Sequence, residues 1–153
     1  MVKDVKGWEV NKVLTNDYLV VKSFSAATTS CMEHYLVPTL KKSPDQVIIH
    51  VVTNNLRKAD PHKVIASKIM DIARTCGKTC KVIVSKVITR GDNLRMKVEA
   101  VNDILKALCN GMNIGFIKNE NITLMDLSNS KLHLNKPGSD KLTTNFVSVL
   151  QKY

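Results

Sequence analysis

Short runs of apolar, mostly β-branched residues alternate along the chain with longer stretches of helical periodicity. These runs predict four strands, over residues 18–24, 47–53, 81–87 and 114–118. The segments between them predict helices over residues 1–14, from Thr28 or Thr29 to about 42, from Asp60 to about 77, from about 93 to 111, and from Pro137 to about 151. Strands separated by helices imply right-handed crossovers, so the pattern predicts an α/β fold with a parallel sheet.

The run Val47–Thr53 is the strongest strand in the pattern, because it is almost wholly apolar and therefore typical of a strand covered on both faces. His50 lies inside this run, and we interpret it as a hydrogen-bonded histidine of the core or the sheet. Doubly wound domains usually begin with a central strand. This chain begins with a predicted helix instead, which indicates that a strand is missing at the front of the sheet.

The composition fits one globular domain of 153 residues, with 44% hydrophobic residues to form a core. No apolar run approaches the length of a membrane span, and the charged start Met1–Asp4 is not a secretory signal. We therefore expect a location in the cytosol or nucleus. The net charge of +10 permits weak binding to nucleic acid. Because the basic residues are dispersed and aromatic residues are few, a lysine-rich soluble surface is the favoured interpretation.

The four cysteines, Cys31, Cys76, Cys80 and Cys109, are interpreted as reduced and mostly as small apolar residues. Cys76 and Cys80 are separated by three residues, one more than in a typical zinc or redox pair, and no second Cys/His pair follows at ligand spacing. We therefore expect neither a metal nor a cofactor.

Five segments together resemble the SGNH, or GDSL-like, hydrolase family, and are closest to the esterase-like domains in open reading frames of animal retrotransposons. They are residues 22–29 (KSFSAATT), 44–56 (PDQVIIHVVTNNL), 88–92 (ITRGD), 101–102 (VN) and 130–138 (SKLHLNKPG). The resemblance extends over nearly the whole chain and implies a three-layer, flavodoxin-like parallel sheet of strand order 2-1-3-4-5. It also implies ester hydrolysis without a cofactor.

In that family a serine of a Gly-Asp-Ser segment, at the end of the first strand, is the nucleophile. A glycine and an asparagine complete the oxyanion hole with the backbone N–H of the serine. A histidine takes the proton of the serine, and an aspartate three residues before it orients the imidazole. The family's serine block would lie immediately before Met1. The resemblance therefore implies one domain over residues 1–153 that is incomplete at its N-terminus and lacks the first, central strand and the nucleophile.

The other catalytic positions are partly changed in this sequence. The resemblance places the oxyanion glycine at Ala26 and the oxyanion asparagine at Asn54. It places the histidine base at His133, and Ser130 occupies the position of the aspartate. A serine there cannot stabilise an imidazolium as a carboxylate does, although retrotransposon-type copies often carry one. The expected function is an esterase-like domain that is inactive in this copy, with an ester as the substrate of longer family members.

Each of these residues also has a structural interpretation. His133 stands between two leucines, which is typical of a structural histidine, and Asn54 could satisfy loop backbone groups. Arg90 and Asp92 are interpreted as a loop and a helix cap. Nothing in the sequence places Ser23 or Ser25 beside His133 as a substitute nucleophile. Two alternatives to a degraded enzyme stay open, namely a non-catalytic binding module that contacts RNA and a decayed fragment without function.

Overall fold

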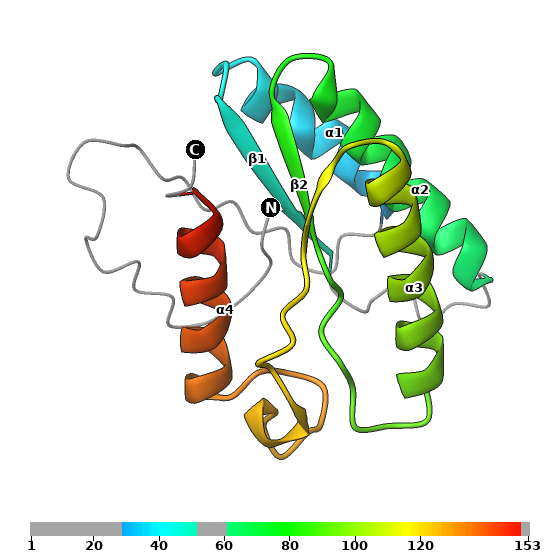
Figure 1. Ribbon diagram of the computed structural model, residues 1–153, viewed down its shortest axis with the longest axis vertical. Helices are drawn as coiled ribbons and strands as arrows, with labels where there is room; N and C mark the ends of the chain where they lie inside the picture. Colours follow the sequence, from blue (N-terminus) through cyan, green and yellow to red (C-terminus); the bar gives the residue numbers. More distant parts are fainter. Residues whose placement is uncertain (1–28, 52–60, 151–153) are drawn as a thin grey trace.

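The computed structural model describes residues 29–51 and 61–150; the predicted helix over residues 1–14 and the predicted strand over residues 18–24 lie outside this part. Strands and helices alternate within it (Figure 1). The elements are α1 (Thr29–Leu40), β1 (Gln46–His50), α2 (His62–Gly77), β2 (Lys81–Ser85), α3 (Arg95–Gly111), β3 (Gly115–Ile117), the 3-10 turn η2 (Leu124–Asp126) and α4 (Lys136–Leu150).

The three described strands form a parallel sheet in the order β1-β2-β3. This confirms the predicted α/β class, and the order is that of the last three strands of the flavodoxin-like sheet. Helices α1, α2 and α3 lie on one side of the sheet and α4 lies on the other, so the molecule has three layers (Figure 1). All three strands point toward the end of the molecule that carries η2 and the start of α4.

Alternate residues of each strand supply the two cores. Val47 and Ile49 of β1 and Val84 of β2 are buried against α1, α2 and α3. Ile83 of β2 is buried on the opposite face, in a second cluster with Leu142 and Phe146 of α4 and with Ile117 of β3. Because successive side chains of a strand point to opposite faces, a strand covered on both sides must be apolar throughout. The apolar run that begins at Val47 has this property, as predicted.

The strands β2 and β3 are shorter than predicted, and side chains explain both ends. The segment after β2 leaves the sheet because the side chain of Asn102 in α3 binds both the N–H and the carbonyl of Val87. Its Oδ1 accepts from the Val87 N–H at 2.8 Å, and its Nδ2 donates to the Val87 carbonyl at 2.9 Å. The chain turns after β3 at Asn119, whose φ of 51 degrees belongs to the left-handed region that asparagine tolerates.

The long helices begin and end close to the predicted positions. Pro61 stands at the N-cap of α2, whereas the predicted cap Asp60 lies outside the described residues. The N-cap of α3 is Leu94 and not the predicted Asp92, whose Oδ1 instead accepts from the Leu94 N–H at 3.2 Å. Both helices present an apolar stripe to the sheet and to each other, which is why their periodicity was visible in the sequence.

Cys76, Cys80 and Cys109 are free thiols, as predicted. Burial raises the pKa of Cys76 to about 11 and the pKa of Cys109 to about 11. These two cysteines therefore stay protonated at neutral pH and serve as small apolar residues of the core.

Candidate functional site

The carboxyl ends of the strands converge with two loops, residues 86–94 after β2 and residues 127–135 before α4 (Figure 1). In open parallel sheets this end is where ligands and catalytic groups gather. His133 and Ser130, two of the residues singled out by the sequence, lie in the second loop. The other two, Ala26 and Asn54, lie outside the described residues, as do Ser23 and Ser25.

Backbone hydrogen bonds fix the loop that carries His133. Leu127 and Leu134 form an antiparallel bridge, and the Ser128 N–H donates to the His133 carbonyl at 2.7 Å. The Asn135 N–H donates to the Asp126 carbonyl at 2.8 Å, which anchors the loop to η2. The backbone of His133 is therefore fixed, while its side chain is exposed at the surface.

Ser130 uses its hydroxyl within the same loop. Its Oγ lies 2.8 Å from the Oγ of Ser128 and accepts from the Leu132 N–H at 3.3 Å. Among the described residues, no hydrogen bond joins Ser130 to the imidazole of His133. The structure therefore brings both residues into one loop without forming the base–acid contact that the family uses.

A backbone contact joins the two loops. The Gly91 N–H donates to the Lys131 carbonyl at 2.9 Å, and a Cβ at Gly91 would lie 2.7 Å from the Cβ of Lys131. Arg90, which is only 2% exposed, pairs through two nitrogens with the carboxylate of Asp92. This hydrogen bonding by Arg90 is the main reason that the pKa of Asp92 is lowered to about 2. Arg90 and Asp92 thus shape the loop that precedes α3.

A buried polar chain crosses the sheet at the ends of the strands. His50 of β1 is paired in register with Ser85 of β2, and its Nδ1 lies 3.0 Å from the Ser85 Oγ. Asn119, which follows β3, donates to the same Oγ at 2.9 Å. Asn145 of α4 donates to the Asn119 Oδ1 at 2.9 Å. The prediction of His50 as a hydrogen-bonded core histidine is confirmed, but the sequence did not reveal Ser85 or Asn119 as its neighbours.

The pair of His50 and Ser85 has the atoms of a base and a nucleophile, but its surroundings are those of a core. Ser85 is 1% exposed, His50 is 5% exposed, and the ring of Phe146 lies edge-on to the imidazole at 5.7 Å. Burial lowers the pKa of His50 to about 3. A nucleophile must be reachable by its substrate. We therefore assign the buried polar chain to stability.

The stability of the protein is expected to depend on the protonation of His50. Because the imidazole pKa is lower in the folded chain (about 3) than in the unfolded chain (6.5), the unfolded state binds more protons between these values. Stability is therefore full above pH 6.5 and falls as the pH drops, by about 2–3 kcal/mol between pH 7 and pH 4.5. Urea unfolding across this pH range measures the loss.

His50→Gln is expected to remove most of this pH dependence, because glutamine stays uncharged. His34→Gln, at an exposed position of α1, is the matched control and should retain the dependence of the parent protein. Equal slopes of stability against pH in the parent and the His50 variant would contradict the assignment. Asp92 titrates outside this window, since its pKa lies near 2.

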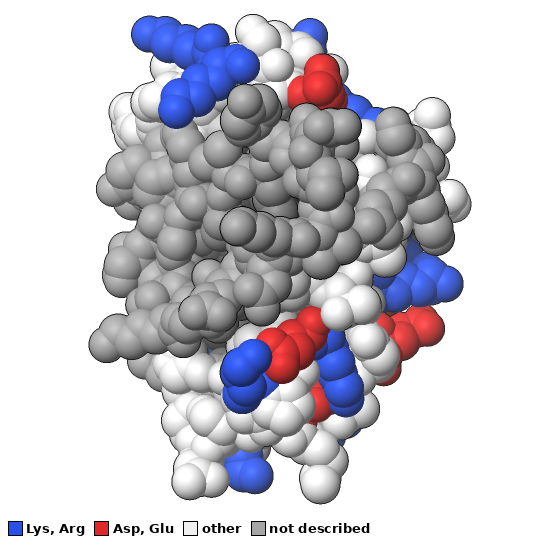
Figure 2. Space-filling model, turned by 90° about the vertical axis from the view of Figure 1, so that its left-hand side faces the viewer, with Lys and Arg blue, Asp and Glu red and all other residues white. Residues whose placement is uncertain are grey.

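The described part of the chain offers little else of catalytic type. It contains no group of three or more His, Cys, Asp or Glu side chains arranged to hold a metal ion. None of its helices has the length and apolarity needed to cross a membrane. Figure 2 shows Lys and Arg side chains, together with Asp and Glu side chains, toward both ends of one face of the described part.

The fold is that of solved GDSL-like lipases and esterases. A GDSL-like lipase from Bacteroides thetaiotaomicron superposes with a TM-score of 0.76 at 17% identity, over 86% of this chain and 74% of that chain. A member of the lipolytic G-D-S-L family from Veillonella parvula gives 0.73 at 14% identity, over 83% and 76%. An acetylxylan esterase from Geobacillus stearothermophilus gives 0.71 at 16% identity, over 84% and 70%.

At these identities the likeness concerns the fold. No protein-family model matches the sequence, and a search of curated proteins gave no match. The chain therefore has a fold of the kind seen in solved GDSL-like hydrolases.

Proposed function

We propose that this chain is an esterase-like domain of SGNH type that does not turn over esters by itself. The fold supports the proposal, since it is that of solved GDSL-like lipases and esterases, and in this proposal His133 and Ser130 occupy the positions of the base and the acid. The observation that carries the proposal is the hydrogen bonding of Ser130, whose hydroxyl is engaged by Ser128 and by the Leu132 amide. The exposed imidazole of His133 thus has no described carboxylate to orient it.

A working triad needs three groups in contact. The base must lie within about 3 Å of the hydroxyl that it deprotonates, and a third group must hold its tautomer. The printed sequence contains no Gly-Asp-Ser segment, and its Ser85–His50 pair is enclosed in the core. Because triad members act as a unit, a scaffold without the nucleophile retains only background catalysis. The substrate of an active relative would be a carboxylic ester.

Hydrolysis of p-nitrophenyl acetate tests the proposal. The purified chain is expected to release p-nitrophenol at the same rate as its His133→Ala variant, because no hydroxyl is activated by that imidazole. The acetylxylan esterase from Geobacillus stearothermophilus serves as the positive control under the same conditions. A saturable rate that falls at least 100-fold in the His133→Ala variant would overturn the proposal.

The closer resemblance, to the esterase-like domains of animal retrotransposons, belongs to the same proposal. It rests on the segments 22–29, 44–56, 88–92, 101–102 and 130–138, and it favours an origin from a retrotransposon open reading frame. A location in the cytosol or nucleus accords with that origin.

A second candidate function is a non-catalytic binding module. The net charge of +10 supports it, since excess Lys and Arg attract phosphates. RNA is the partner that this charge and the proposed origin suggest. The dispersion of the basic residues along the sequence favours weak, salt-sensitive contacts over a defined RNA groove.

A further inference from the structure

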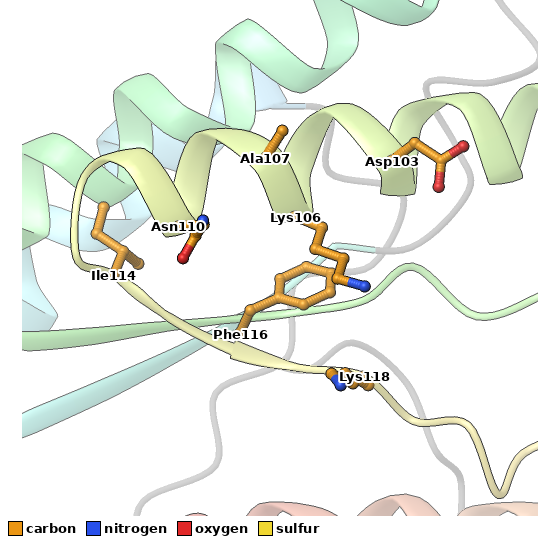
Figure 3. A pocket seen from close by; sticks show the side chains of 7 residues that line it. All are labelled: Asp103, Lys106, Ala107, Asn110, Ile114, Phe116 and Lys118. Carbon is orange, nitrogen blue, oxygen red and sulfur yellow. The ribbon is translucent and has the colours of Figure 1, made fainter.

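A groove lies between helix α3 and strand β3, and its lining includes no residue of the loops 86–94 and 127–135 (Figure 3). Its volume is about 560 Å³. Asp103, Lys106 and Asn110 of α3 form one wall, and Phe116 and Lys118 lie along the strand. Since none of these residues belongs to the candidate hydrolase site, the groove needs an explanation of its own.

The outer edge of β3 carries backbone groups that can pair with another strand. In the described sheet β3 pairs only with β2, with Phe116 in register with Val84. The Ile117 carbonyl accepts from the Lys86 N–H at 2.9 Å and therefore points toward β2. In a parallel ladder the N–H and C=O of one residue point to the same side, and those of the next residue point to the opposite side. The N–H and C=O of Phe116 consequently point away from β2, along the edge of the described sheet that borders the groove.

The two lysine side chains of the groove favour a negatively charged ligand. Lys106 reaches over the Phe116 ring from the helix, and Lys118 stands just beyond the strand (Figure 3). Both lysines are exposed, and Phe116 is half-buried. An extended chain laid along β3 would therefore meet an apolar surface flanked by two cations. Asp103 lies farther along the helix and lowers the affinity for a long polyanion at that end.

We propose that this groove binds an acidic, extended peptide segment of a partner protein, which adds to the sheet as a strand beside β3. Main-chain hydrogen bonds to Phe116 provide the common part of the affinity in such β-augmentation, and side-chain contacts provide the selectivity. On the face that turns toward α3, an apolar side chain packs beside the Phe116 ring, and acidic side chains two residues before or after it meet Lys106 and Lys118.

The same observations disfavour other occupants. Single-stranded nucleic acid is held by several stacked aromatic rings and a continuous basic track, whereas this groove has one ring and includes Asp103. A second copy of the chain would bring another Lys118 and another strongly positive molecule to the same edge. An acidic peptide is the one occupant that matches both the open strand edge and the charge.

Binding of a labelled dodecapeptide of repeated Glu-Thr-Val-Thr, which places Glu and Val in turn on one face of the strand, tests the proposal on the full chain. We expect fluorescence anisotropy to show saturable binding that weakens at least tenfold in the double variant K106E/K118E. The double variant K63E/K78E makes the same change in net charge at exposed positions of α2 and its C-cap, and it should bind within twofold of the parent. Hydrogen exchange of the Phe116 amide should slow at least tenfold when the peptide is bound.

Several outcomes would overturn the proposal. They are an absence of saturable binding, equal weakening in the two double variants, and equal affinity for a peptide whose alternate nitrogens are methylated and cannot pair with a strand. Tighter binding of a decauridylate, with the same amides perturbed, would assign the groove to nucleic acid. Protection of the Phe116 amide through self-association, without peptide, would assign it to a second copy. None of these readouts depends on ester hydrolysis.

Discussion

Replacing Asn102 by leucine is expected to lower the free energy of unfolding by about 4 kcal/mol. Asn102 is 4% exposed, and its amide serves both the N–H and the carbonyl of Val87. Leucine fills a similar volume but leaves two buried backbone groups without partners, each at about 1–3 kcal/mol. Urea unfolding at pH 7, monitored by circular dichroism, measures the change.

Asn110 provides the control for this substitution. It lies on the same helix, but its side chain is exposed, so Asn110→Leu should change stability by no more than about 0.5 kcal/mol. A similar small effect of Asn102→Leu would mean that water satisfies the groups of Val87. The large effect is expected because Asn102 determines where the chain leaves the sheet and enters the loop that contacts Lys131.

Gly138→Ala is expected to destabilise the fold by about 2–3 kcal/mol, although alanine is a better helix former than glycine. A Cβ at Gly138 would lie 2.4 Å from the carbonyl oxygen of Asp126 and 3.0 Å from a methyl group of Leu134. The backbone oxygen cannot move easily, because it also accepts from the Asn135 N–H at 2.8 Å. The first turn of α4 must therefore separate from η2. Thermal unfolding of the variant measures the loss.

Gly111→Ala is the matched control, because a Cβ at Gly111 would have no neighbour within 4 Å. It lies at the end of α3, where alanine should leave stability unchanged or raise it by up to about 1 kcal/mol. If both glycine variants were equally stable, the close approach of α4 to η2 would not be a constraint of the native state.

The layered fold could be predicted from the sequence because the apolar residues of each strand and helix recur with the period of that kind of element. The continuous apolar run from Val47 and the amphipathic stretches of α2 and α3 are local signals that need no knowledge of distant residues. The short segments around residues 88–92 and 130–138 then suggested the GDSL-like fold that the solved structures share. The length of β2 could not be predicted, since it depends on Asn102, which comes from 15 residues farther along the chain.

The site was less accessible to prediction because its contacts depend on register and burial. His50 was recognisable as a core residue, but its neighbour Ser85 is fixed by the pairing of β1 with β2, which no local pattern encodes. The burial of Arg90 was also not predictable, since arginine is seldom buried unless it is paired. Its partner Asp92 stands only two residues away, and that spacing was the available signal.

The division of apolar side chains between the two faces of the sheet is unequal. In the part of the chain that the structure describes, the face with α1, α2 and α3 has far more buried side chains than the face with α4. Cooperative units with less buried apolar surface open more often than the rest of a protein. Helix α4 and the histidine loop that leads into it therefore form the layer most prone to partial opening. The His133 imidazole therefore keeps its position only while α4 stays packed on the sheet.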